Sequence, residues 1–223
     1  MTFSIVARCA ETGMFGMAIS SSSPAVAARC PHARAGVGAV ASQNITDPAL
    51  GSKVLQAMGA GASAADAISA QMDAPFIDYR QLLAVDAQGR TASHSGAQVL
   101  GVWAVADGDN AIAGGNLLAN PQVPQAMIDG FAATKGHLAD RLLAALHGGL
   151  AAGGEAGPVH SAGLLVVDQQ SWPLVELRCD WEEACPIAHI SAAWVVYKPQ
   201  MLAYVDRALN PTVAPSYGVP GDE

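Results

Sequence analysis

The second residue of the chain, Thr2, could act as the nucleophile of a hydrolytic enzyme. Methionine before a small residue such as threonine is normally removed, and Thr2 would then carry both a hydroxyl group and a free α-amine. An α-amine titrates near about pH 7.7 to 8.0, so at neutral pH its unprotonated share can accept the hydroxyl proton through a water molecule. A trimmable residue at position 2 is common, so this hypothesis depends on the residues around Thr2.

Acyl transfer at Thr2 would also need hydrogen-bond donors directed at the oxyanion of the tetrahedral intermediate. One source is the end of the glycine-rich segment 34–43, with the side chains of Gln43 and Asn44. A second source is Asn116, which follows two glycines, and its neighbour Gly115 is expected to border the substrate. An asparagine after two glycines is also typical of a turn, so both interpretations of Asn116 stay open.

The elements that must position these residues follow from periodicity and turn residues. Apolar runs predict a hairpin of residues 3–7 and 15–20, a third strand at 35–42, a hairpin of 81–85 and 90–95, and two last strands at 161–167 and 174–177. Helical spacing predicts helices beginning at Asp47-Pro48 and at Ser63, then helices at 123–131 and 138–150, and a terminal helix at 187–209 with a kink at Pro199. This order is typical of layered α+β folds with antiparallel sheets under helices, in one domain of residues 1–210 followed by an extended arm, 211–223.

Several segments resemble a bacterial family of unknown function that is assigned to the N-terminal-nucleophile (Ntn) hydrolase superfamily. They are Thr2–Ala7 (TFSIVA), Gly16–Ser23 (GMAISSSS), Arg34–Gln43 (RAGVGAVASQ), Asp86–Arg90, Gly115–Leu118, Ala151–Gly154 and Ser161–Ala162. The resemblance covers most of residues 2–180. It implies a four-layer αββα sandwich, two antiparallel sheets covered by helices, with the nucleophile at the start of the first strand. The superfamily includes the proteasome β-type subunits.

The chain departs from that superfamily pattern at Ser20, Ser21, Ser22 and Ser23. In the proteasome pattern an acidic residue near the end of the second strand orients a lysine that polarises the threonine, and relatives often show lysine where Ser22 stands. Arg34 is then the nearest cation in sequence that could lower the pKa of the amine. The serines form either a polar turn or the lining of a small polar substrate pocket, to which Ser20, Ser21 and Ser22 would contribute.

The segment Val159–Gly163 comes close to the G-x-S-x-G motif of serine esterases. That motif needs a turn from strand to helix, whereas Ser161 opens a predicted strand and valine replaces the first glycine. The resemblance instead assigns Ser161 to the superfamily's serine near the N-terminal amine. His160 either contacts substrate or is a hydrogen-bonded residue at a strand edge.

Composition excludes other classes of function. The 223 residues carry a formal net charge of −8 and have a sequence pI near 5.1, which disfavours nucleic acid as a partner. No apolar run reaches the length of a membrane span, the first residues lack a signal peptide, and the protein is expected in the cytoplasm. The six histidines show no metal-binding spacing and the glycine-rich segments no phosphate loop, so we expect neither metal nor cofactor. Four scattered cysteines are expected to be buried thiols.

The leading hypothesis is an Ntn amidohydrolase that opens an amide of a small polar molecule through an acyl-Thr2 intermediate. The alternative is a non-catalytic αββα module that binds a small ligand or a protein partner, because the acid and lysine of the pattern are missing. A chain that is 51% hydrophobic and 13% charged, with an aromatic terminal helix before a proline-rich arm, also predicts a homo-oligomer.

Overall fold

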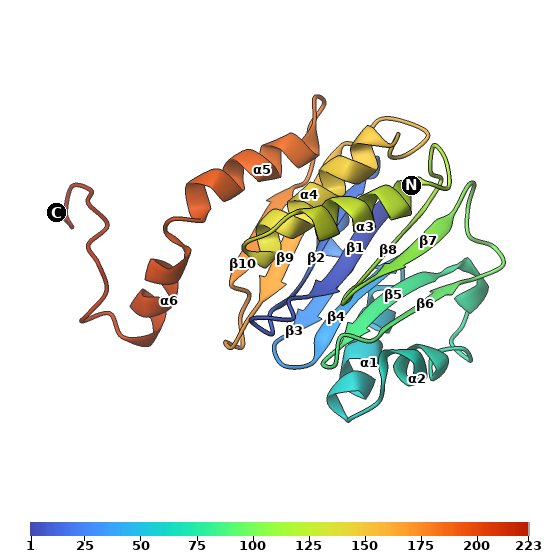
Figure 1. The fold of residues 1–223 in the computed structure, drawn as a ribbon, viewed down its shortest axis with the longest axis horizontal. Coiled ribbons are helices and arrows are strands. Elements are labelled where there is room, and N and C mark those ends of the chain that lie inside the picture. Colours follow the sequence, from blue (N-terminus) through green and yellow to red (C-terminus); the bar gives the residue numbers. More distant parts are fainter. Residues whose placement is uncertain (223) are drawn as a thin grey trace.

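The computed structural model of the protein describes residues 1–222 and contains two antiparallel sheets stacked face to face (Figure 1). The first has six strands in the order β10-β9-β2-β1-β8-β7, and the second has four in the order β3-β4-β5-β6. The strands of the first are β1 (Thr2–Arg8), β2 (Phe15–Ser21), β7 (Ala104–Gly108), β8 (Ala111–Asn116), β9 (Ser161–Val167) and β10 (Val175–Cys179). Those of the second are β3 (Pro31–Arg34), β4 (Gly38–Gln43), β5 (Gln81–Asp86) and β6 (Thr91–Ser95).

Helices cover the outer faces of both sheets. The pair α1 (Pro48–Gly59) and α2 (Ala64–Ser69) covers the four-stranded sheet, while α3 (Val123–Ala133), α4 (Leu138–Ala151) and α5 (Pro186–Tyr197) cover the six-stranded sheet. The last helix, α6 (Met201–Leu209), leads away from the sandwich (Figure 1), and two short 3₁₀ turns, η1 (Val26–Ala28) and η2 (Ile77–Tyr79), complete the elements. The predicted four-layer αββα sandwich is confirmed. Within residues 1–222, no helix is long and apolar enough to cross a membrane.

Helix α1 shows how local sequence determines an element of this fold. The Asp47 carboxylate accepts a hydrogen bond of 3.0 Å from the Ala49 N–H, and Pro48 occupies the first turn, where its missing N–H costs nothing. Four apolar side chains at helical spacing are buried against the sheet: Leu50, Val54, Leu55 and Met58. The expected helix start at Asp47-Pro48 is therefore confirmed.

Two expectations about strands and helices are corrected. The predicted third strand, residues 35–42, is wrong in its first part, because residues 35–37 form the turn between β3 and β4, with Gly36 at φ +70° and a Val37 N–H to Arg34 carbonyl bond of 3.1 Å. The predicted terminal helix is two helices. Pro199 separates them, because it has no N–H for the helical ladder, and α6 begins at Met201.

Candidate active site

A row of polar residues crosses four adjacent strands of the six-stranded sheet. Thr2 opens β1 and lies opposite Asn116, the last residue of β8. On its other side, the Thr2 Oγ1 is 3.4 Å from the Oγ of Ser21, the last residue of β2, and Ser21 pairs in turn with Ser161, the first residue of β9. The polar row is thus Asn116, Thr2, Ser21 and Ser161, and all four residues are buried.

The Thr2 end of this row borders a cavity of about 260 Å³. Its lining residues are Met1, Thr2, Ser23, Arg29, Cys30, Asn44, Ile45, Thr46, Leu100 and Asn116. The hydroxyls of Thr2 and Ser21 both donate to the carbonyl oxygen of Met1, so the first peptide group occupies the place beside the candidate nucleophile. Removal of Met1 would enlarge the cavity, free both hydroxyls and create the amine at Thr2.

Asn116 is oriented by a buried network of amides between the two sheets. Its Nδ2 donates to the Gln81 Oε1 over 3.2 Å, and Gln43 Nε2 donates to the same oxygen over 2.9 Å. The Oε1 of Gln43 accepts from Ser4 Oγ over 2.7 Å. Each amide therefore has fixed neighbours. Within residues 1–222 the second N–H of Asn116 has no hydrogen-bond acceptor, and the residue lines the cavity.

The other two predicted oxyanion donors have structural partners. Gln43 is not among the cavity-lining residues, and both hydrogens of its Nε2 are engaged, with Gln81 and, over 3.4 Å, with the Gly114 carbonyl. Asn44 does line the cavity, in a left-handed conformation with φ 56°. Its side chain binds the Tyr79 carbonyl and the Leu100 N–H, so it ties together two loops at the cavity mouth.

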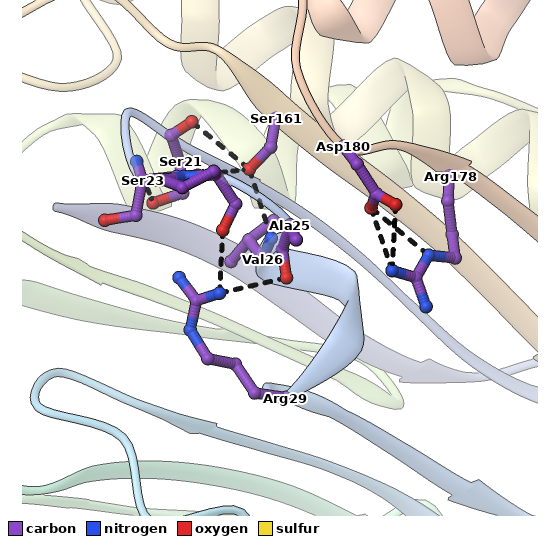
Figure 2. Close-up of polar contacts among 9 residues, drawn as sticks. Ser21, Ser23, Ala25, Val26, Arg29, Ser161, Arg178 and Asp180 are labelled. Atoms are coloured by element: carbon purple, nitrogen blue, oxygen red, sulfur yellow. Dashed lines mark hydrogen bonds and ion pairs between the residues drawn. The ribbon is translucent and has the colours of Figure 1, made fainter.

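Ser161 positions the segment that follows β2. Its Oγ donates to the Ser23 carbonyl over 2.6 Å and accepts from the Val26 N–H over 3.2 Å (Figure 2). Ser20 is buried and donates to the Ser161 carbonyl, while Ser22 presents its backbone N–H to a carboxylate described below. Of the four serines it is Ser23 that lines the cavity.

Glu155 is a residue near the site that the sequence did not single out. The residue is 4% exposed, and both of its carboxylate oxygens lie 3.1 Å from the Ser22 backbone nitrogen. Burial raises the pKa of Glu155 to about 7, although the positive terminal amine and the Ser22 hydrogen bonds oppose that shift. A carboxylate from the loop after α4 thus lies against the backbone of the serine segment, which carries no acid of its own. Only the two glycines before it mark that loop in the sequence.

The arginine beside Thr2 is Arg29 and not Arg34. The guanidinium of Arg34 donates to the Leu55 carbonyl of α1 over 3.2 Å and does not line the cavity. Arg34 is close to the serine segment in sequence but not in space. Its side chain extends from β3 to α1, on the outer face of the four-stranded sheet. Arg29 follows η1 and lines the cavity directly.

His160 and Gly115 lie next to the site without lining its cavity. The His160 ring stacks on Trp181 at 4.4 Å, and its Nδ1 lies 3.1 Å from the Glu182 carbonyl oxygen. Gly115 accepts a hydrogen bond from Gln81 Nε2 through its carbonyl, so it belongs to the amide network.

A larger cavity, of about 480 Å³, lies at the opposite end of β1, beside Cys9 and Arg141. Hydrogen bonds with Thr12 lower the pKa of the Cys9 thiol against the effect of its burial. We assign the candidate active site to the smaller cavity, because it is lined by Thr2, the candidate nucleophile, whose hydroxyl lies beside that of Ser21, and by the oriented amide of Asn116.

The fold and site define an αββα sandwich whose second residue, Thr2, opens a central strand and borders a cavity. The chain belongs to DUF1028, a family of unknown function, whose model matches residues 2–190. It is similar to the crystal structure of protein SPO2555 from Silicibacter pomeroyi, described as a DUF1028 member, with 31% identity, a TM-score of 0.83, and coverage of 88% of this chain and 86% of that one.

A second solved structure, Anbu (ancestral beta-subunit) from Yersinia bercovieri, matches with 11% identity and a TM-score of 0.40, over 91% of this chain and 97% of that one. This similarity is too low to support a functional argument. The comparison with curated proteins finds no match.

Proposed function

We propose that the protein is an Ntn amidohydrolase that cleaves the C–N bond of a small amide through an acyl-Thr2 intermediate. The observation that carries this proposal is the position of Thr2, whose hydroxyl lies at the start of the central strand, beside Ser21, and borders a cavity that Asn116 shares. The resemblance to the Ntn superfamily in the first strands supports the same assignment.

The chemistry begins with removal of Met1, which gives Thr2 a free α-amine. The amine accepts the Thr2 hydroxyl proton, Oγ1 forms a bond to the amide carbon, and the Asn116 Nδ2 donates to the resulting oxyanion. Collapse of this intermediate breaks the C–N bond, and the protonated amine returns its proton to the leaving nitrogen. The products of this half-reaction are an ester at Thr2 and a free amine.

Water completes the cycle. The α-amine accepts a proton from the attacking water, a second tetrahedral oxyanion forms, and the ester bond to Oγ1 breaks as that oxygen regains a proton. A carboxylic acid leaves and Thr2 is regenerated. Ser21 supports both half-reactions, because its Oγ, which now donates to the Met1 carbonyl, would face the new amine.

The removal of Met1, which the mechanism requires, is tested by the intact mass of the purified protein. We expect a mass lower than that of the encoded chain by one methionine residue. The matched control is Thr2→Leu, in which the large second residue should preserve Met1. A native chain that retains Met1 would leave Thr2 without its amine and would refute the enzymatic proposal.

A ligand-binding module without catalysis is the second candidate function. It is favoured by the contacts of the Met1 carbonyl with both hydroxyls, which a chain that keeps Met1 would preserve. Retention of Met1 together with binding of a small molecule at the same cavity would select this candidate.

A further inference from the structure

Arg29 is held rigidly at the wall of the cavity. Its Nη1 donates to two backbone carbonyls, that of Pro24 over 2.7 Å and that of Ala25 over 2.9 Å (Figure 2). The segment that carries these carbonyls is itself anchored, because the Ala25 N–H donates to the Asp180 carbonyl and the Val26 N–H to Ser161 Oγ. The guanidinium is therefore oriented before any ligand arrives, which reduces the entropy lost on binding.

The other edge of this guanidinium is free to bind a ligand. Within residues 1–222 neither Nε nor Nη2 of Arg29 donates to a protein group, and no carboxylate forms an ion pair with it. Arg29 is half-buried and lines the cavity. The parallel N–H pair of this edge matches the two oxygens of a carboxylate.

The charged groups that line the cavity also favour an anionic ligand. Among its lining residues, Arg29 has the one charged side chain, the terminal amine of Met1 adds a second positive group, and no lining residue carries a carboxylate side chain. The chain as a whole carries −8, so a positive side chain in this position is not part of a basic surface. A cavity with an oriented guanidinium, a terminal amine and no carboxylate in its lining selects an anion by direct contact rather than by long-range attraction.

We propose that the ligand of this cavity is a small carboxylate-bearing amide, such as an N-acyl amino acid or the half-amide of a dicarboxylic acid, bound through the Nε and Nη2 of Arg29. This inference rests on the proposed function for the reaction, and it adds the substrate class. The volume of about 260 Å³ fits a small metabolite, with further room once Met1 is removed.

The test is calorimetric binding of two matched pairs of probes to the full-length, Met1-trimmed protein. The carboxylates are N-acetylglycine and succinamate, and their neutral counterparts are N-acetylglycinamide and succinamide. The two pairs distinguish a carboxylate on the amine side of the amide from one on the acyl side. We expect at least one carboxylate to bind about tenfold more tightly than its neutral counterpart, the effect of a charge-assisted hydrogen-bonded pair.

Three variants test whether Arg29 causes the preference for carboxylates. Arg29→Gln should abolish the preference, Arg29→Lys should keep part of it because the charge remains without the planar fork, and Arg178→Gln should leave it intact. Arg178 is a suitable control because it pairs with Asp180 outside the cavity lining. Melting temperatures show whether each variant is folded. The inference is overturned by any of three results: neither carboxylate binds, each carboxylate binds no more tightly than its neutral counterpart, or the preference for the carboxylate persists in Arg29→Gln.

The same titration in Thr2→Ala separates this inference from the proposed function. The carboxylate preference should persist in this variant, because Arg29 and not Thr2 carries it. A preference found in a wild-type protein whose Thr2 is never acylated would confirm the ligand class and refute the amidohydrolase proposal. Acylation at Thr2 without any carboxylate preference would support the amidohydrolase proposal and refute the ligand class.

Discussion

Glu155 makes the stability of the protein depend on pH in a defined window. Burial raises its pKa from an ordinary value of 4.5 to about 7. Between these two values the unfolded chain has lost the proton and the folded chain still holds it, so the contribution of Glu155 to stability is complete below pH 4.5 and is lost as the pH rises through about 7. We therefore predict that wild-type stability falls relative to Glu155→Gln across this range.

Urea unfolding midpoints of the wild type and Glu155→Gln, measured in parallel from about pH 4 to about pH 8, check this prediction. Because histidines also titrate in this range, the difference between the two proteins is the informative quantity. It should grow in favour of the glutamine variant up to about pH 7 and then level off. A difference that does not change with pH would contradict the assigned shift.

The sequence identifies the residues of the site that belong to strand ends and fails for those that belong to loops. Thr2 and Ser161 could be predicted because each begins a strand with a clear apolar pattern, and Asn116 because it follows two glycines in a segment that resembles the family. Glu155 and Arg29 could not, because one follows a glycine-rich loop and the other a 3₁₀ turn, where no periodicity indicates the direction of a side chain. Their proximity to Thr2 arises only from tertiary packing.

At the scale of elements, the register of three strands creates the site. Phe3 pairs with Ser20 in the β1–β2 hairpin, so Thr2 comes to lie beside Ser21, and the pairing of Thr2 with Asn116 adds β8 on the other side. A slip by one residue in either pairing would turn the polar side chains away from each other, because side chains alternate between the faces of a sheet. The polar row therefore depends on strand register as much as on residue type.

The substitution Gly115→Ala tests whether the polar row depends on the pairing of β1 with β8. A Cβ at this position would lie 2.8 Å from the Thr2 carbonyl oxygen and 2.6 Å from Leu118 Cδ2, so Gly115→Ala must displace β1 from β8. We predict a loss of about 1 to 3 kcal/mol in the free energy of unfolding, as for other overpacked sites, and slower acylation of Thr2.

The matched control is Gly157→Ala. A Cβ there would meet only the end of the Met1 side chain, at 3.5 Å, which is ordinary van der Waals contact. Chemical denaturation and acylation rates of both variants supply the measurement. Equal stability of Gly115→Ala and the wild type would show that β1 and β8 tolerate the extra methyl group, against the packing described.

Of the three strands that the sequence pattern does not predict, β3 and β7 are edge strands and β8 is an interior strand. Neither β3 nor β7 follows from the apolar pattern, and each lies at the end of its sheet. Edge strands are half-exposed and pair on one side only, so they need no strong apolar alternation, and β3 even begins with Pro31. The interior strands β1, β2, β4, β5 and β9 carry the recognisable pattern, whereas β8 (AIAGGN) is buried but consists mostly of small residues.

At the scale of the whole molecule, the order of elements is enough to predict four layers but not the order of strands. The central pairing of β1 with β8 joins residues that are far apart in the chain, such as Thr2 and Asn116, and local patterns do not determine such contacts. The layers could be predicted because each helix and strand has one apolar face that must be buried against a partner.

Self-association is the prediction that belongs to this scale. Val195, Val196 and Leu202, on α5 and α6, are 64% to 73% exposed, so an apolar surface remains uncovered in the single chain. The arm turns back on α6, where Arg207 binds the Pro215 carbonyl over 2.8 Å and stacks on Tyr217. We predict a dimer or larger assembly in which this surface is covered and to which the arm contributes.

The predicted self-association is checked by light scattering at micromolar concentration, on the full chain and on a chain cut after Leu209. We expect an assembly for the full chain and a smaller species after truncation, because we predict that the arm, besides its contacts with its own α6, also contacts a neighbouring chain. A monodisperse monomer whose mass is unchanged apart from the removed residues would contradict the prediction.

The central claim, that Thr2 is the nucleophile, is tested most directly by covalent labelling. The trimmed protein is treated with a β-lactone that acylates N-terminal threonines, and the labelled residue is located by peptide mass spectrometry. We predict one acyl group per chain on Thr2, and no label in Thr2→Ala at an unchanged melting temperature. Label found on Ser161 or Cys9, and equally abundant in Thr2→Ala, would contradict the account.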